Sequence, residues 1–200
     1  IVTSDGERSP NPRHLRRLER KLAREQRTRS RRHRGSHRYR KQREQVARLH
    51  ERVQNARADF SHKLSHRLVS ENQGLIAEDV SIQGMARTRL AKRVYDAGWG
   101  EFLRPLEYKC PWRGKTFHQI DRWFPSSRIH NSCGAKNAIT LSDRRFVCTG
   151  CGEIVDPDGN AAKNIKHQGL IDLKMVAVGH TETGNARGET VRLATASASR

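Results

Sequence analysis

The sequence predicts an α/β protein, and two periodicities support this prediction. Between residues 12 and 68, leucine and valine recur every three or four positions, which is the spacing of an amphipathic helix. Beyond residue 72, apolar residues come in short runs bounded by Gly or Asn, as they do in buried strands. With 200 residues, the chain has room for one substantial domain, or for one domain and a small module.

Basic side chains are concentrated in the first third of the chain. Lys and Arg number 40 against 21 Asp and Glu, a formal net charge of +19, and residues 1–70 alone hold 21 basic against 7 acidic residues. This excess requires an anionic partner or a strongly solvated surface, and nucleic acid is the first candidate. Phosphates would provide most of the binding, because Tyr39 and Phe60 are the only aromatic residues of the helical segment. A solvated face without a partner is the alternative.

The composition also excludes some classes of protein. Hydrophobic residues make up 34% of the chain, so a compact core must be confined to part of it. The longest apolar runs are only a few residues, far short of the ~18 that span a bilayer, and the amino end does not resemble a secretory signal. We therefore expect neither an integral membrane protein nor a disulfide framework among the four cysteines.

A tight turn and two helices are expected first along the chain. Asp5-Gly6 predicts a hairpin turn, because this pair tolerates the positive φ that such turns require. One amphipathic helix is expected from residue 12 to about 29 and a second from about 37 to 68, with a break at Gly35. The two would form an antiparallel hairpin with a basic outer face. The candidate nucleic-acid-binding residues on it are Arg16, Arg17, Arg20, Lys21, Arg24, Arg40, Lys41 and Arg43.

Shorter elements follow. The run from Gly74 to Val80 predicts a buried strand that ends in acidic residues. Cys110 would lie on a helix as a buried thiol, next to the inward-facing apolar residues Phe102, Leu103 and Leu106. The remaining expectations are helices at 88–97, 99–112 and 160–167, a strand at 115–121, and a disordered tail beyond 179.

Two short turns carry the pattern of a zinc site. Cys148 and Cys151 form a C-x-x-C-G turn, which supplies two thiolates, and His130 and Cys133 form the same turn upstream with histidine in first place. The segment 139–148 between them alternates like a β-hairpin. The pattern predicts a zinc ribbon with structural Zn²⁺ held by these four residues, since three thiolates and one imidazole suit zinc. Three unrelated reduced cysteines and a surface histidine are the alternative.

Two acidic residues are candidates for a catalytic metal site. Glu78 ends the expected strand, and Asp158 precedes the helix at 160–167. Metal-dependent nucleases bring such carboxylates together around a metal pair. Spacing alone favours the simpler explanation, in which Glu78 is a surface residue and Asp158 a helix cap.

Taken together, the segments resemble the TnpB (OrfB) family of insertion-sequence transposon proteins, which are related to type V CRISPR effectors. The similar stretches run in family order over about residues 1–170. They are Asn11-Pro-Arg-His-Leu-Arg-Arg-Leu-Glu, Ala58-Asp-Phe-Ser-His-Lys-Leu-Ser, Ile76-Ala-Glu-Asp-Val, Asp96-Ala-Gly-Trp-Gly-Glu-Phe, Asp121-Arg-Trp-Phe-Pro-Ser-Ser, Leu141-Ser-Asp-Arg, the Cys148 turn and Asp156-x-Asp-x-Asn-Ala-Ala-x-Asn-Ile.

The resemblance implies a transposon-encoded, RNA-guided DNA endonuclease with DNA and guide RNA as partners, in the cytoplasm of a prokaryote near the nucleoid. Glu78 and Asp158 match the family's second and third catalytic acids, which would hold Mg²⁺. The implied fold is a split RuvC-like domain of ribonuclease H type. The expected layout is a partial RuvC-like domain at 1–125 with the basic hairpin at 12–70, a zinc ribbon at 126–155, the last RuvC-like segment at 156–178 and the disordered tail at 179–200.

The sequence departs from the family pattern at several points. The family's first catalytic aspartate belongs on a strand upstream of Ile1, and Asp5 lies in a turn, where it is a poor substitute. The family's amino-terminal RNA- and target-recognition region is also not in this sequence. His130 replaces the usual cysteine, and Pro157 replaces an arginine. We therefore expect little cleavage by the chain as given, and a truncated relic that only binds DNA or RNA is the alternative function.

Overall fold

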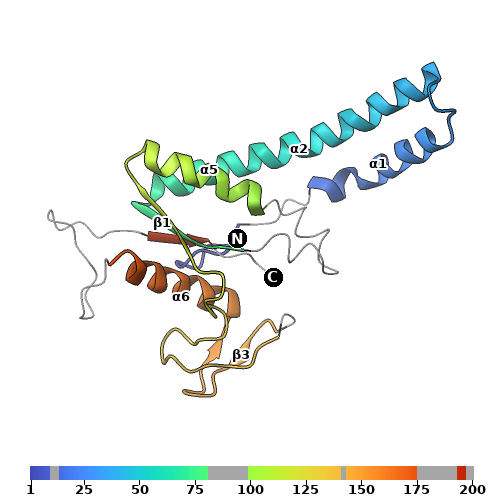
Figure 1. Ribbon diagram of the computed structural model, residues 1–200. Helices are drawn as coiled ribbons and strands as arrows, with labels where there is room; N and C mark the ends of the chain where they lie inside the picture. The colour runs from blue at the N-terminus through green and yellow to red at the C-terminus, as the bar shows by residue number, and fades with distance from the viewer. Residues whose placement is uncertain (10–13, 81–98, 141–142, 175–192, 197–200) are drawn as a thin grey trace.

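The computed structural model describes residues 1–9, 14–80, 99–140, 143–174 and 193–196 (Figure 1). A long helical hairpin lies on one side of a small sheet, and the helix α6 (Pro157–Asp172) covers the opposite face of the sheet. A small ribbon lies beyond α6. The mixture of helices and strands confirms the α/β prediction.

The hairpin consists of α1 (His14–Ser30) and α2 (His37–Glu71), at the places that the leucine and valine spacing predicts. The side chain of Ser36 caps α2 by accepting a 3.1 Å hydrogen bond from the backbone N–H of Tyr39. Far from the sheet, the two helices are joined by a small apolar cluster of Leu22, Val46 and Leu49. The predicted antiparallel helical hairpin is thus confirmed.

Three parallel strands form the main sheet, in the order β2-β1-β5. They are β1 (Gly74–Glu78), β2 (Thr116–Ile120) and β5 (Leu193–Ala196). The first two strands lie where the sequence predicts them. The expectation of a disordered tail at 179–200 is wrong for residues 193–196, which pair with β1 along its length. A four-residue strand of Leu, Ala and Thr has too little hydrophobic pattern of its own to be recognised, and its pairing is purely long-range.

The two faces of β1 belong to different clusters of apolar residues. Leu75 and Ala77 face α2 and the helix α5 (Trp99–Trp112), where Cys110 is fully buried, as expected. Ile76 points to the opposite face and packs with Ile120 and with α6 (Pro157–Asp172). This alternation follows from the two-residue period of a strand, and both faces are covered, as is usual for parallel strands.

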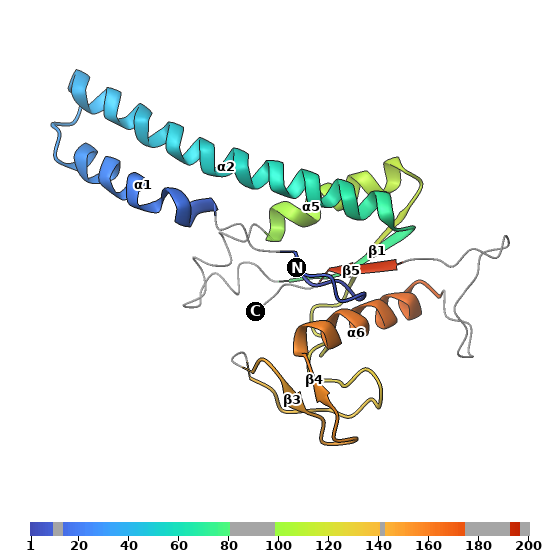
Figure 2. The ribbon, with the colours of Figure 1, turned by 180° about the vertical axis from the view of Figure 1, so that it is seen from behind.

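The ribbon is built differently from the prediction. Its two strands, β3 (Phe146–Val147) and β4 (Ile154–Val155), are antiparallel and lie on either side of the Cys148 turn (Figure 2). We expected a hairpin within 139–148, but the described part of that segment forms only the strand β3. The alternating pattern was misleading because the turn that reverses the chain is the Cys148 turn, which follows the segment.

Two further expectations concern the turn near the amino end and the helix at 88–97. The turn at Asp5-Gly6 is confirmed, since Val2 and Arg8 form an antiparallel bridge around it and Gly6 has a φ of 84°. The helix expected at 88–97 lies outside the described residues. No helix in the described ranges is long and apolar enough to cross a membrane.

Candidate metal centre and the neighbouring carboxylates

The four predicted zinc ligands converge on one point. The donor atoms of His130, Cys133, Cys148 and Cys151 all lie within 4.8 Å of one another. His130 Nδ1 lies 3.2 Å from Cys133 Sγ and 3.3 Å from Cys151 Sγ, and the sulfurs of Cys133 and Cys148 are 3.5 Å apart. Zinc–sulfur and zinc–nitrogen bonds in a tetrahedron place donors about 3.5–3.8 Å apart, so these donors would need to move by only a few tenths of an ångström to about 1 Å to bind zinc.

The two turns owe their shape to glycines and to backbone amides that point inward. Gly134 and Gly152 follow the second ligand of each turn with φ of 73° and 77°, where a residue with a Cβ would be strained. Their N–H groups donate to the carbonyls of His130 and Cys148, which closes each turn at 2.8 Å. The N–H of Gly150 points at Cys148 Sγ, at 3.4 Å. The same local geometry is therefore built twice.

The pKa values of the cysteine thiols also favour a cation between the sulfurs. Burial opposes ionisation of Cys148, but the N–H groups of Gly150 and Cys151 outweigh burial and lower the pKa of its thiol to about 6. The pKa of Cys151 is raised instead: the Glu153 N–H favours its thiolate, but desolvation and the neighbouring sulfurs outweigh that contact. The cluster thus accepts one negative charge easily and resists a second. A divalent cation would relieve this repulsion, so the donor set fits zinc.

Sequence reasoning did not identify the partner on the other side of the histidine. His130 is 2% exposed, and its Nε2 lies 3.4 Å from a carboxylate oxygen of Glu153. A carboxylate in this position holds the hydrogen on Nε2 and leaves the Nδ1 lone pair for a metal. Glu153 lies two residues beyond Cys151, and an exposed acidic residue at that place gives no signal in a sequence.

A pair of asparagines fastens the ribbon to α6. The side-chain N–H groups of Asn160 and Asn164 both donate to the carbonyl of Ile129, at 2.6 Å, next to the ligand His130. Asn160 also accepts the backbone N–H of Asn131 at 2.8 Å. Residues four apart share one face of a helix, which explains the Asn-Ala-Ala-x-Asn spacing. The motif is therefore a docking element, and it fixes the zinc site relative to α6.

The two candidate catalytic acids come from different elements on either side of this junction. Glu78 is half-buried at the carboxyl end of β1, paired in register with Ile120. Asp158 lies in the first turn of α6, and the guanidinium of Arg8 lies 3.6 Å from its carboxylate. The same guanidinium binds Asp156 at 2.5 Å.

A cleft of about 390 Å³ opens at this turn of α6. Sequence reasoning missed Arg8 as the partner of Asp158, because 150 residues separate the two. The lining residues are Arg8, Asp143, Arg144, Arg145, Asp156, Pro157 and Asp158.

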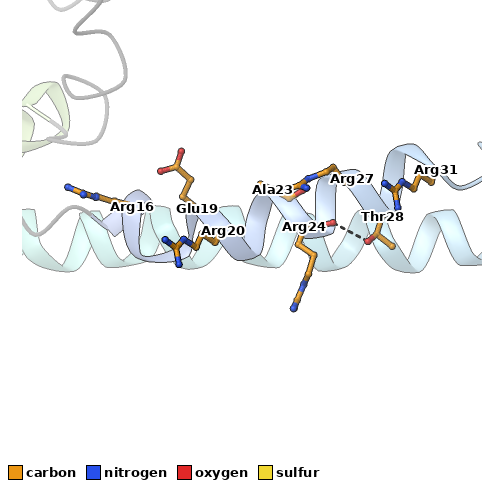
Figure 3. Close-up of a pocket in the computed structure, with 8 residues that line it drawn as sticks. All are labelled: Arg16, Glu19, Arg20, Ala23, Arg24, Arg27, Thr28 and Arg31. Atoms are coloured by element: carbon orange, nitrogen blue, oxygen red, sulfur yellow. Dashed lines mark hydrogen bonds between the residues drawn. The ribbon is translucent and has the colours of Figure 1, made fainter.

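A row of arginines lines an open groove along α1 (Figure 3). Arginine recurs every three or four residues, so the arginines share one broad face of the helix, from which their side chains spread in different directions. The groove, of about 1070 Å³, is lined by Arg16, Glu19, Arg20, Ala23, Arg24, Arg27, Thr28 and Arg31. The predicted binding residues whose side chains are described are all exposed, namely Arg16, Arg20, Lys21, Arg24, Arg40, Lys41 and Arg43.

Two family models match two consecutive segments of the chain. Residues 1–89 match the OrfB family model of IS605 elements, described as "Probable transposase". Residues 99–165 match the family model "Cas12f1-like, TNB domain". The chain belongs to the OrfB transposase family. The OrfB segment contains the helical hairpin and Glu78, and the second segment contains all four candidate zinc ligands and Asp158.

Three relatives of this OrfB chain carry the same description. A Streptomyces pristinaespiralis protein named "Putative RNA-guided DNA endonuclease" is 44% identical over 172 residues, which are 85% of this chain and 42% of that protein. A Mycobacterium tuberculosis protein of the same description is 36% identical over 166 residues, which are 80% of this chain and 36% of that protein. Escherichia coli InsQ is 29% identical over 163 residues, which are 74% of this chain and 40% of InsQ. The chain thus spans less than half the length of these relatives.

Proposed function

We propose that this chain forms the zinc-ribbon part and much of the nuclease part of an RNA-guided DNA endonuclease, with a RuvC-like arrangement of its sheet. The observation that carries the proposal is the junction between the ribbon and α6. Asn160 and Asn164 bind the segment that follows β2, and β2 pairs with the strand that ends in Glu78. The helix that carries Asp158 is thereby held against the strand that carries Glu78.

In this proposal, Glu78 and Asp158 provide carboxylate oxygens for Mg²⁺, which would supply an activated water for phosphodiester cleavage. Arg8 now balances the charge of Asp158, at 3.6 Å, and is half-exposed. Because the Arg8 side chain is 55% exposed and its contact with Asp158 is long, we expect this ion pair to be weak enough for the guanidinium to turn away when another cation or a phosphate arrives. Zinc would have a structural role, since four protein donors leave no position open for a substrate.

The helical hairpin would bind the phosphate backbone of RNA or DNA. Along α1, guanidinium groups from Arg16 to Arg31 extend over about 22 Å, at a rise of 1.5 Å per residue. Arg forms bidentate contacts with phosphate, and such contacts carry no information about base sequence. We therefore expect binding that depends strongly on salt and weakly on sequence.

Removal of single positive charges tests the binding part. We expect Arg20→Gln to weaken binding of the chain to a mixed-sequence oligonucleotide and to lower the salt slope of log K by about 1. Lys163→Gln removes an equally exposed charge on α6 and serves as the matched control, with an unchanged slope. Equal salt slopes for the wild type and Arg20→Gln would show that the groove along α1 does not bind phosphates.

Cleavage tests the nuclease part. The chain is joined to the part of its Streptomyces relative that the match does not cover, and the joined protein is incubated with guide RNA, target DNA and Mg²⁺. Glu78→Gln and Asp158→Asn are compared with Asp59→Asn, which lies on the exposed face of α2. The proposal requires Mg²⁺-dependent cutting that both site variants lose and the control keeps. Nucleic-acid binding without cutting by the joined protein would leave the non-catalytic binder as its function.

A further inference from the structure

The side chain of Trp123 is the most exposed large hydrophobic group among the residues that the structure describes. The residue is 84% exposed and lies three positions beyond the end of β2. Single exposed apolar residues are common on protein surfaces. Trp123 differs from such residues in two ways. Hydrogen bonds hold the turn on which it lies, and this turn follows the carboxyl end of β2.

Hydrogen bonds and packing hold the turn around Trp123. The carboxylate of Asp121 accepts the backbone N–H of Trp123 at 2.6 Å, and the carbonyl of Asp121 accepts the N–H of Phe124 at 3.2 Å. The next ring in the sequence, Phe124, packs inward against the cluster of Ile76, Ile120 and Ile165. The partly buried Phe124 thus anchors the turn, and the hydrogen bonds to Asp121 fix the backbone from which the exposed indole of Trp123 projects.

The turn lies beside the candidate catalytic edge. Glu78 is paired with Ile120 in the sheet, and the N–H of Asp79 donates to the carbonyl of Ile120 at 3.3 Å. Arg122, directly before the tryptophan, donates from its Nε to the Asp79 carboxylate at 2.9 Å. In sheets of parallel strands, ligands bind outside the carboxyl ends of the strands, which is where this turn emerges.

We propose that Trp123 is a stacking platform for an unpaired base of a nucleic-acid strand that lies along this edge. The inference rests on the proposed function and adds the conformation of the substrate to it. Every base has a flat π-face that an indole can cover, but a base within a duplex is already covered on both sides. Trp123 therefore selects single-stranded over double-stranded nucleic acid, and the phosphate next to the stacked base lies near Glu78.

Binding of two probes by the chain separates stacking from phosphate contacts. One probe is a 20-nucleotide oligothymidylate, and the other is an abasic strand of the same length and charge. Trp123→Ala should weaken oligothymidylate binding about 5- to 100-fold and leave binding of the abasic strand unchanged. Trp123→Phe keeps an aromatic face and should restore most of the loss. Oligouridylate shows whether RNA is bound in the same way, and a 20-base-pair duplex should be bound equally by the wild type and Trp123→Ala.

Trp112→Ala is the matched control. Trp112 is 79% exposed but precedes the amino end of β2, whereas Trp123 follows its carboxyl end. The ring of Trp112 lies 4.7 Å from that of Tyr108. Its removal should leave all affinities unchanged.

Three results would overturn the proposal: equal oligothymidylate affinities for the wild type and Trp123→Ala, a loss that is the same for the abasic strand, or an equal loss on Trp112→Ala. The proposed function would survive any of these if the Arg20→Gln slope and the Glu78→Gln loss of cutting are observed.

Discussion

The imidazole of His130 has a different partner on each of its two nitrogens. Nδ1 faces the three sulfurs, and Nε2 faces the carboxylate of Glu153. Partners of this kind raise the basicity of a ligand and fix its orientation, and their loss commonly reduces metal affinity about 10- to 100-fold. Because Glu153 is largely exposed, we expect an effect at the lower end of this range.

The first prediction is that Glu153→Gln lowers zinc affinity about 10-fold without changing the fold. The measurement is a competition titration against a chromogenic chelator. Glu44→Gln, an exposed residue on α2, is the control and should have no effect. An unchanged affinity in Glu153→Gln would show that the carboxylate does not orient the ring.

The second prediction concerns the choice of histidine over cysteine. His130→Cys should still bind one metal per chain, because four thiolates also form a closed tetrahedral site. With Co²⁺ in place of zinc, the sulfur-to-metal charge-transfer absorption should increase relative to the wild type, since a fourth thiolate joins the three. Cys133→Ser should decrease it. Identical spectra for His130→Cys and the wild type would exclude position 130 from the ligand set.

At the scale of single residues, the sequence was sufficient to predict which four donors converge and insufficient for their surroundings. The four candidate ligands follow from two short turns whose chemistry is local. That they bind zinc stays a prediction. Glu153 behind His130 and Arg8 beside Asp158 are contacts of exposed charges, and their residue types have many other uses on a surface. Glu78 and Asp158 stay a prediction as catalytic residues.

Among the elements, α6 approaches β1 closely enough to exclude a side chain. A Cβ at Gly169 would lie 2.4 Å from Cγ2 of Ile76, which is fully buried. A helix interior normally prefers Ala over Gly by about 1 kcal/mol. At this position, the clash should reverse that preference.

We therefore predict, third, that Gly169→Ala lowers the free energy of unfolding by about 1–3 kcal/mol, because Ile76 must move within a packed core. Denaturant unfolding followed by circular dichroism gives the value. His167→Ala, on the exposed side of α6, should change stability by less than about 0.5 kcal/mol. A Gly169→Ala protein as stable as the wild type would mean that the helix can move away from the sheet.

Fourth, Asn164→Ala should destabilise the contact between the ribbon and α6 by about 1–3 kcal/mol, since the carbonyl of Ser126 loses its donor and the carbonyl of Ile129 keeps only that of Asn160. Asn164 donates to the carbonyls of Ser126 and Ile129 at 2.7 and 2.6 Å. Faster hydrogen exchange of the ribbon amides, with the hairpin amides unchanged, is the expected readout. Lys163→Ala is the exposed neighbour that should leave exchange as it is.

Elements with a strong local period were predictable from the sequence, and short ones were not. The helices α1, α2 and α5 follow from apolar spacing over several turns, and β1 from a buried run bounded by Gly. The strands β3 and β4 have two residues each, and β5 has four. The pairing of β3 with β4 depends on the Cys148 turn between them, and the pairing of β5 depends on the edge of β1 that β2 leaves open. Such pairing is not encoded in the few residues of each strand.

The whole molecule consists of parts that are stabilised by different means. The apolar clusters beside the sheet and within the hairpin contain no residue of the ribbon 126–155. The ribbon contributes buried polar residues and sulfur instead, including Ser126, His130, Asn137 and Cys148. We therefore expect a segment with so small an apolar core to depend on a bound metal for its fold.

The fifth prediction is that zinc removal unfolds the ribbon and leaves the rest of the molecule folded. After chelation, helical circular dichroism should fall only slightly, and amides of residues 126–155 should lose their protection from hydrogen exchange. Re-addition of Zn²⁺ should restore it, and Mg²⁺ should not, because thiolates bind it poorly. A cooperative loss of all helical signal on chelation would show that the sheet depends on the ribbon.

The position of β5 in the sheet has a consequence for the order in which the protein is made. Gly74 pairs with Leu193, 119 positions later in the sequence, so β1 lacks one neighbour until that later segment has left the ribosome. At about 5–20 residues per second, this interval lasts on the order of ten seconds, during which one edge of a parallel strand is open to other chains. The helical hairpin needs only local contacts and can form early, and its positive charge would keep nascent chains apart until the last strand arrives.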